Sequence, residues 1–574
     1  MDLKVMFYRR RLPAALMLLL AVALAIAAAA CGSGDPTSPA AATTPTTAPG
    51  TTATVAGATP TTTASPASEL GRGGTLRIAI TAADVPLTDQ ATDQGAEGNR
   101  WAGFTLGDGL VDWELGQNDH VPGFIEGIAE SWEIDPEDPT RWLFKLRSDA
   151  TYHDGTPIDA ESIVYNYDRL LNPDAANFNA TLSAGKGPAK STIASYGVVD
   201  ESTFEIVTQA PDSFLLYQVV AIWAHSPTAM EAAGPDDYRN DPQGSGPFKF
   251  VSKQARTSLV MEPYENYYKD KARLDRLIIL PMSEATTRLA ALRTNAVDWI
   301  EVPPPDAIPG LEADGFDIYM TQTAHNWPHQ FNLSKAPFDN KLVRQALNYA
   351  IDRESLCRDL LNDTCEPGLS FANQATPWVG ESEQVYSYDP EKAKALLAEA
   401  GVELPLTYKV LISASGSGQM LPVPMNEFVQ RNLAEIGIEM EIEVIEWNTY
   451  IGFLRSDGFA SGQAAEYDAV NVSWLSVDPS GFVTLHYSAS TPPNGWNIPG
   501  YNNPEFDSLV DQARATSDIG LRDEMLTEAN QILTEDAPWL WIAHDRNPRV
   551  LSPKVKNYVQ EKHTYTSVVN VWVE

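Results

Sequence analysis

Residues 343–352 read VRQALNYAID. Their apolar side chains recur at helical spacing, which predicts an amphipathic helix with one buried face. The preceding Asp339 is a suitable N-cap residue, so we expect the helix to begin directly after it. Arg344 and Asp352 are polar positions on this helix, and we expect both side chains to hold the fold rather than to contact a ligand.

Helices and strands alternate on both sides of this segment. Residues 390–400 follow an Asp-Pro helix start and end before a glycine. A helical pattern over residues 429–436 leads into residues 438–444, where apolar residues alternate with glutamates as in a strand with one buried face. Strand alternation also occurs over residues 76–80, and an Asn-Pro start opens a helical pattern over residues 504–513. The chain is therefore predicted to belong to the α/β class, with mixed sheets that helices cover.

The composition fits a large, acidic globular protein. The chain has 574 residues, enough for two or three lobes with buried interiors, and 43% of them are hydrophobic. Its formal net charge is −36, and no cluster of Lys and Arg is visible that could bind phosphates. Nucleic acid is therefore excluded as an expected partner.

The amino-terminal segment has the order of a secretory signal. Three arginines precede the unbroken apolar run Ala14–Ala30, which predicts a signal peptide over residues 1–30. The small residues before Cys31 resemble a bacterial lipobox, although Ala28 stands where leucine is usual, so Cys31 is predicted to carry a lipid. The alternative is an uncleaved transmembrane anchor, for which the run is of marginal length. Residues 31–72 begin with this cysteine and are rich in Thr, Pro and Ala, which predicts a disordered tether.

Several further segments stand in one order along the chain. They are AESW at 129–132, WLFKLR at 142–147, YHDGTP at 152–157, GSGPF at 244–248, APFD at 336–339 and YNNPEFD at 501–507. Together with residues 343–352 they resemble the bacterial extracellular solute-binding proteins of family 5, which include dipeptide, oligopeptide and nickel receptors. The resemblance extends over about residues 73 to 574.

The resemblance implies a two-lobed, periplasmic-binding-protein-like fold of type II, in the large peptide-receptor cluster, with a hinged cleft between the lobes. The first lobe is expected over residues 73–325, with an inserted subdomain, and the second over residues 326–540. Residues 541–574 then return to the first lobe, and the two crossings are expected near residues 322–331 and 538–545.

The implied activity is that of the substrate-binding receptor of an ABC importer. Such a receptor captures a small solute outside the cell, with a peptide as the first expectation, and delivers it to the permease and ATPase subunits. We expect a monomer that needs no cofactor, binds no metal ion and is lipid-anchored on the outer face of the cytoplasmic membrane. A receptor of the same fold for an oligosaccharide or a nickel chelate remains an alternative.

Ser473 and Trp474 resemble the Gly-Trp or Ser-Trp pair that the family places at the ligand. An indole suits a cleft because its flat face excludes water while its N–H can still donate a hydrogen bond. The family's peptide receptors hold the ligand's amino group with a carboxylate three residues after this tryptophan, where Val477 stands here. Asp478 follows one residue later, so either a small gap restores the contact or the chain does not bind peptides through their amino terminus. Further candidate contacts are Asp84, Trp101, Trp327, Trp496 and Asn497.

Two other classes of function have less support. A secreted enzyme is disfavoured because the sequence contains no HExxH motif and no Walker phosphate loop, and the serine-rich residues 413–418 lack the G-x-S-x-G spacing. Metal uptake is suggested by His325 and His329, whose i, i+4 spacing could present two imidazoles to nickel. Pro328 lies between them and disfavours a helix that carries both, so we expect two isolated polar histidines.

Cys357 and Cys365 are the only thiols of the exported body, and we expect them to form a disulfide in an oxidising environment. On one uninterrupted helix their Cα atoms would lie about 12 Å apart, beyond the roughly 7 Å that a disulfide can bridge. The helix that begins after Asp339 must therefore stop between them, and Asn362-Asp363 is the expected place.

Overall fold

The computed structural model describes residues 71–90, 93–234, 237–381, 384–456, 458–460 and 465–574. The expected signal peptide, Cys31 and all but the last two residues of the expected tether lie outside this part of the chain. Residues 69–574 form one compact unit, which contains both lobes. No helix in the described ranges combines the length and the apolar character needed to cross a bilayer.

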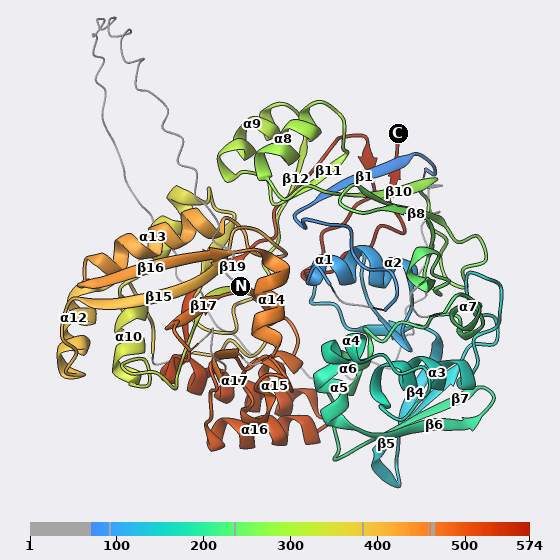
Figure 1. The fold of residues 1–574 in the computed structure, drawn as a ribbon, viewed down its shortest axis with the longest axis horizontal. Helices are drawn as coiled ribbons and strands as arrows, with labels where there is room; N and C mark the ends of the chain where they lie inside the picture. The colour runs from blue at the N-terminus through green and yellow to red at the C-terminus, as the bar shows by residue number, and fades with distance from the viewer. Residues whose placement is uncertain (1–70, 91–92, 235–236, 382–383, 457, 461–464) are drawn as a thin grey trace, which may run out of the picture. The chain divides into compact units, whose positions relative to one another are not determined.

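The first lobe is built on two sheets (Figure 1). The larger has the order β12-β20-β11-β1-β10-β9-β8 and the smaller the order β4-β5-β7-β6. The larger sheet consists of β1 Thr75–Ile80, β8 Phe248–Gln254, β9 Ser258–Pro263, β10 Arg276–Pro281, β11 Trp299–Glu301, β12 Asp317–Tyr319 and β20 Arg549–Leu551. The smaller consists of β4 Ala129–Asp135, β5 Asp138–Leu146, β6 Ile193–Asp200 and β7 Thr203–Thr208, and it packs with α3 (Ala160–Leu171) in a separate hydrophobic core.

The second lobe is built on one sheet with the order β14-β19-β13-β17-β15-β16, in which β18 also pairs with β13. Its strands are β13 His325–Phe331, β14 Cys365–Pro367, β15 Leu406–Ser413, β16 Ile438–Ile445, β17 Ala469–Asn471, β18 Trp474–Leu475 and β19 Trp539–Asp545. Its helices are α10 Lys341–Tyr349, α12 Pro390–Glu399, α13 Pro422–Ala434, α14 Trp447–Ser456, α15 Ser480–His486, α16 Pro504–Ala515 and α17 Ile519–Asp536. Figure 1 shows α10, α12 and α13 beside β15 and β16, with α15, α16 and α17 grouped together below them. These elements confirm the predicted α/β class and the helices and strand expected over residues 390–400, 429–436, 438–444 and 504–513.

Two short segments connect the sheets of the two lobes. Residues 320–324 join β12 to β13, and residues 546–548 join β19 to β20. The first link overlaps the predicted segment 322–331, and the second directly follows the predicted segment 538–545. β13 and β19 themselves pair with each other inside the second-lobe sheet. The return to the first lobe therefore begins after residue 545 rather than at 541, because every residue of β19 is buried in that sheet.

The helix expected over residues 343–352 is shorter than its apolar pattern. α10 ends at Tyr349, although the following Ala350 and Ile351 are still buried. Its N-cap is Asn340 rather than Asp339, because the Asn340 side chain accepts a hydrogen bond from the N–H of Leu342 at 2.9 Å.

The two polar residues singled out on this helix contact the protein itself. The guanidinium of Arg344 donates to the carbonyl oxygens of Asp536 and Phe338, at 2.7 and 3.0 Å. The carboxylate of Asp352 accepts the N–H of Ser355 at 3.1 Å and caps the next helical turn. Both side chains thus hold the fold, as expected.

Cys357 and Cys365 are bonded to each other, with Cα atoms 5.3 Å apart. Cys357 lies in the π-helical turn Leu356–Leu360, and Cys365 is the first residue of β14. The chain turns between them at Asn362 and Asp363, which have positive φ angles of 46° and 59°. The turn lies where the sequence predicted it, but α10 has already ended before Cys357 and is not the helix that the turn stops.

Candidate functional site

A cavity of about 630 Å³ lies between the two lobes. Ligand sites for small molecules typically have volumes of about 300–1,000 Å³. The cavity is reached from the carboxyl ends of parallel strands on both sides: β1 leads to it in the first lobe, and β15, β16 and β17 lead to it in the second. In open α/β sheets this edge is where ligands bind.

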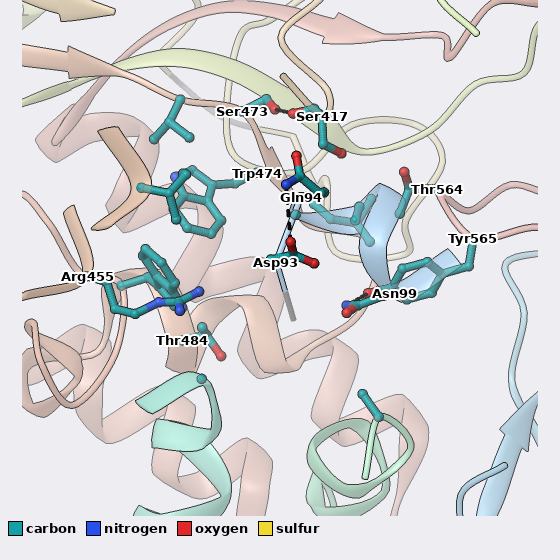
Figure 2. A pocket seen from close by; sticks show the side chains of 18 of the residues that line it. Asp93, Gln94, Asn99, Ser417, Arg455, Ser473, Trp474, Thr484, Thr564 and Tyr565 are labelled. Carbon is teal, nitrogen blue, oxygen red and sulfur yellow. Dashed lines mark hydrogen bonds between the residues drawn. The ribbon is translucent and has the colours of Figure 1, made fainter. Parts of the chain in front are cut away.

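The first-lobe wall comes from three separate parts of the chain. Asp93 and Asn99 follow β1, Lys186 and Tyr217 belong to the inserted subdomain, and Tyr565 lies on the returning carboxyl-terminal segment. The Asp93 carboxylate accepts the N–H of Leu87 at 2.7 Å, which fixes its loop. The Asn99 amide donates to the Tyr565 hydroxyl at 2.9 Å and joins two of the three parts (Figure 2).

The second-lobe wall is mainly aromatic. Trp474 and Trp496 lie with ring centroids 5.0 Å apart, and the Arg455 guanidinium lies 5.4 Å from the centroid of the Trp496 ring. Ser417 and Thr484 add hydroxyl groups. Figure 2 shows Arg455 and Trp474 on one side of the cavity and Asp93 and Asn99 on the other.

Gly418 allows the loop that carries Ser417 to lie close to β13. Its φ is +69°, and a Cβ atom there would lie 2.6 Å from the Cε1 atom of His325. A side chain at this position would therefore clash with His325 at the start of β13 as well as strain the backbone.

Three charged side chains line the cavity without forming an ion pair to any carboxylate or cation of the described residues: Asp93, Lys186 and Arg455. Burial raises the pKa of Asp93. Burial also lowers the pKa of Arg455, an effect that the charge of Asp93 partly offsets. The pKa of Lys186 is lowered to about 8 by burial alone. Charges held in a partly dry cavity without an ion-pair partner favour ligands that bring the opposite charges.

Of the residues proposed from the sequence, Trp474 and Trp496 line the cavity, and Asp84, Trp101, Trp327, Asp478 and Asn497 do not. Trp101 is fully buried in the first-lobe core, edge-on to Trp299. Trp327 is fully buried in β13, and its indole N–H donates to the carbonyl of Gln419 at 3.0 Å.

Two further candidates serve the loops in which they lie. Asn497 is fully buried, and its amide donates to the carbonyl of Tyr501 at 2.8 Å. Asp84 accepts the backbone N–H groups of Val85 and Arg256. Both side chains are thus engaged by backbone groups, mostly within four residues, and are not directed into the cavity.

Asp478 lies beside the cavity without lining it. Its carboxylate accepts the N–H of Ser480, a lining residue, at 2.9 Å and so holds the start of α15. Burial raises the pKa of Tyr217 and Tyr565, which line the first-lobe wall, and the charge of Asp478 adds to the rise. Val477, at the spacing where the family's peptide receptors carry the carboxylate, is 1% exposed.

His325 and His329 lie on a strand, β13, and have separate surroundings. His325 lines the cavity, and burial lowers its pKa to about 4. Both ring nitrogens of His329 are hydrogen-bonded, to the Tyr408 hydroxyl at 3.0 Å and to the side-chain amide oxygen of Asn426 at 2.8 Å. Within the described ranges no group of three or more His, Cys, Asp or Glu side chains is placed to hold a metal ion.

Sequence reasoning missed most of the polar lining, including Asp93, Lys186, Ser417 and Arg455. The glycines at 416 and 418 were an available signal for Ser417. They follow β15, and a glycine-rich loop at the carboxyl end of a strand often approaches a ligand. Nothing in the local sequence of Arg455 or Lys186 distinguishes them from surface cations.

Comparisons with known proteins agree with this architecture. Residues 123–496 match the bacterial extracellular solute-binding proteins, family 5 Middle. Heme-binding protein A of Haemophilus influenzae is 30% identical over 491 residues, which cover 81% of this chain and 86% of that protein. The dipeptide-binding protein of Escherichia coli is 27% identical over 495 residues, which cover 80% and 88%.

Among solved structures, the periplasmic binding protein DppA from Helicobacter pylori, in complex with the peptide STSA, has the same fold with a TM-score of 0.76. It is 23% identical, and the match covers 88% of this chain and 99% of that one. The two-lobed fold and the solute-binding family predicted from the sequence are thereby confirmed. The chain belongs to the bacterial extracellular solute-binding proteins of family 5.

Proposed function

We propose that this substrate-binding receptor of an ABC importer carries short peptides. The observation that supports a peptide cargo is the placement of unpaired opposite charges, Asp93 and Arg455, on the walls that the two lobes contribute. A peptide has a positive and a negative terminus in the same molecule. Asp93 would accept hydrogen bonds from the amino group, and Arg455 would donate to the carboxylate with the geometry that a guanidinium offers.

The aromatic residues give the remaining contact. Trp474 and Trp496 present flat apolar faces that can pack on a side chain or on a peptide plane, and the closure of the lobes around them removes water from the charged contacts. The E. coli relative is a dipeptide-binding protein, and the H. pylori structure contains a peptide, which supports this choice of cargo.

The test is titration calorimetry with a zwitterionic dipeptide such as Ala-Phe and with its N-acetylated, C-amidated analogue. We expect the free dipeptide to bind and the blocked one to lose its affinity. Arg455→Gln is expected to weaken binding about 10- to 100-fold, because a hydrogen bond to a charged group contributes about 1.5–3 kcal/mol. The matched control is Arg431→Gln, since Arg431 is exposed and contacts the Phe428 ring outside the cavity. Equal affinity for free and blocked peptides would refute the proposed cargo.

We further propose that a lipid on Cys31 anchors the receptor to the outer face of the cytoplasmic membrane. The apolar run before Cys31 and the Thr-, Pro- and Ala-rich stretch after it support this assignment. Cys31→Ser is expected to release the processed protein from membranes into the soluble fraction, which fractionation and immunoblotting would measure. A processed variant that still sediments with membranes would contradict the anchor.

A further inference from the structure

Lys186 is a buried cation in the wall of the interlobe cavity. It ends a short helical turn, Ala184–Lys186, in the inserted subdomain, and only 6% of its surface is exposed. Its ammonium nitrogen donates to the carbonyl of Ala221 at 2.6 Å and lies 5.2 Å from the centroid of the Trp223 ring. An ammonium group has three N–H donors, so this carbonyl satisfies only one of them.

No carboxylate of the described residues neutralises this charge. Lys186 forms no ion pair with them, and burial is the sole influence that shifts its pKa. Burying an ammonium group without an ion-pair partner costs the folded protein free energy. One neutral hydrogen bond and one contact with an aromatic ring recover only part of that cost. A lysine held under these conditions at a ligand cavity is explained if the ligand supplies the missing negative charge.

Asp93 and Arg455 already suit the two charges of a simple zwitterion, so Lys186 is not needed to bind one. Arg455 lies within electrostatic reach of Asp93, and these two suit the two termini of a peptide. Lys186 stands on a different segment of the wall, the turn Ala184–Lys186 of the inserted subdomain, and forms no ion pair with Asp93. A third charged position, separate from the pair that holds the termini, corresponds to a side chain of the ligand.

We propose that Lys186 binds a side-chain carboxylate of the cargo, so that the receptor selects short peptides containing Asp or Glu. This inference rests on the proposed peptide function and specifies its substrate class. The ammonium group would donate to the carboxylate with the two N–H groups that Ala221 leaves unused, in a site where few water molecules compete.

The experiment compares peptides that differ by one charge and almost nothing in shape: Ala-Glu with Ala-Gln, and Glu-Ala with Gln-Ala, each by titration calorimetry. For the unmodified protein we expect the acidic peptide of at least one pair to bind about 10-fold or more tightly than its amide. In Lys186→Met the ratio should fall to about 1. The matched control is Lys190→Met, which removes an exposed lysine of the neighbouring helix α5 (Gly187–Thr192) and should keep the ratio.

The outcomes separate this inference from the function on which it rests. If the amide peptides bind the unmodified protein as tightly as the acidic ones, or if Lys186→Met keeps the preference, the role of Lys186 is refuted and the peptide function stands. If no peptide of either pair binds, the proposed function fails and the inference fails with it. A second readout needs no ligand: Lys186→Met should melt at the same or a higher temperature than the unmodified protein, because it removes an unpaired buried charge. A clearly lower melting temperature would assign Lys186 a structural role instead.

Discussion

Trp474 lies half-buried where two hydrophobic clusters of the second lobe meet the cavity. Trp474→Ala is expected to weaken peptide binding about 10-fold or more while costing little stability, since part of the ring already faces the cavity. Trp327→Ala is the contrasting variant, because Trp327 is fully buried and truncation of such a core tryptophan costs about 3–5 kcal/mol. Calorimetric binding and urea unfolding measure the two effects. Unfolding of Trp474→Ala would show that Trp474 is a core residue.

Asp545 is a buried acid at the end of β19, next to the second crossing. Burial raises its pKa to about 7, and the nearby Arg549 and Arg100 limit the rise. Its carboxyl group lies 3.7 Å from the Nδ1 atom of His325, whose own pKa is about 4. Near pH 6 the imidazole is therefore neutral and the contact is not an ion pair.

The pH dependence of Asp545→Asn follows from these values. In the unfolded chain an Asp has a pKa of about 3.9, so the stability that protonated Asp545 contributes is complete below that pH and is lost as the pH rises to about 7. Asp545→Asn should consequently raise the free energy of unfolding by about 2–4 kcal/mol at pH 8 and by little at pH 4, as measured by urea unfolding. The His325 contribution is present in both proteins and cancels in the difference. A gain that is the same at both pH values would contradict the assignment.

Among the elements, the sequence predicted which segments are helices and strands better than it predicted where each one ends. Residues 438–444 form β16 as expected, because alternation with glutamates leaves a strand only one way to bury its apolar face. The pattern over residues 343–352 predicted a helix of the right face but the wrong end: Ala350 and Ile351 are buried after the helix has ended. The spacing of apolar residues indicates which positions are buried, and here the buried positions continue past the end of the helix.

The candidate site shows the same limit. Trp474 was found through its resemblance to the family's Ser-Trp pair, and Trp496 also lines the cavity. Trp101 and Trp327 have the same residue type but lie in the core, so residue type alone does not separate the two groups. Arg455 could not be predicted because it lines the cavity only through the way α14 packs against its sheet. Which face of a helix meets a cleft depends on contacts between distant segments.

The disulfide ties the π-helical turn Leu356–Leu360 to β14, which pairs with β19 at the second crossing. Cys365 lies opposite Asp545 in this pairing, so the bond fixes the second-lobe end of that crossing. Thiol counting on denatured, unreduced protein should find no free sulfhydryl at Cys357 and Cys365. The Cys357→Ser/Cys365→Ser variant should lose about 2.5 kcal/mol of unfolding free energy, the chain-entropy value for so short a loop. Two titratable thiols in the unreduced protein would refute the bond.

Contacts between the lobes outside the cavity bear on the whole molecule. Asp212 of the first lobe forms an ion pair with Arg514 of α16 at 2.7 Å, and the Asp212 side chain is only 1% exposed. The N–H of Ser213 donates to the carbonyl of Arg514 at 2.7 Å. Beside the cavity, the N–H of Glu97 donates to the hydroxyl of Ser417, a lining residue, at 3.3 Å. These bonds join segments on either side of the crossings at 320–324 and 546–548, so a hinge motion would break them.

Ligand is therefore expected to shift the molecule toward the state in which the lobes touch. Small-angle scattering should give a smaller radius of gyration with saturating peptide than without it, and the melting temperature should rise through linkage. Arg514→Gln leaves Asp212 buried without its ion-pair partner when the lobes are together, and so disfavours that state. The variant should therefore enlarge the ligand-free molecule and weaken binding about 3- to 30-fold. Arg358→Gln is the control, since Arg358 pairs with Asp359 on the surface of one lobe. If peptide-saturated and ligand-free protein scatter identically, and Arg514→Gln leaves both profile and affinity unchanged, the receptor does not close around its cargo.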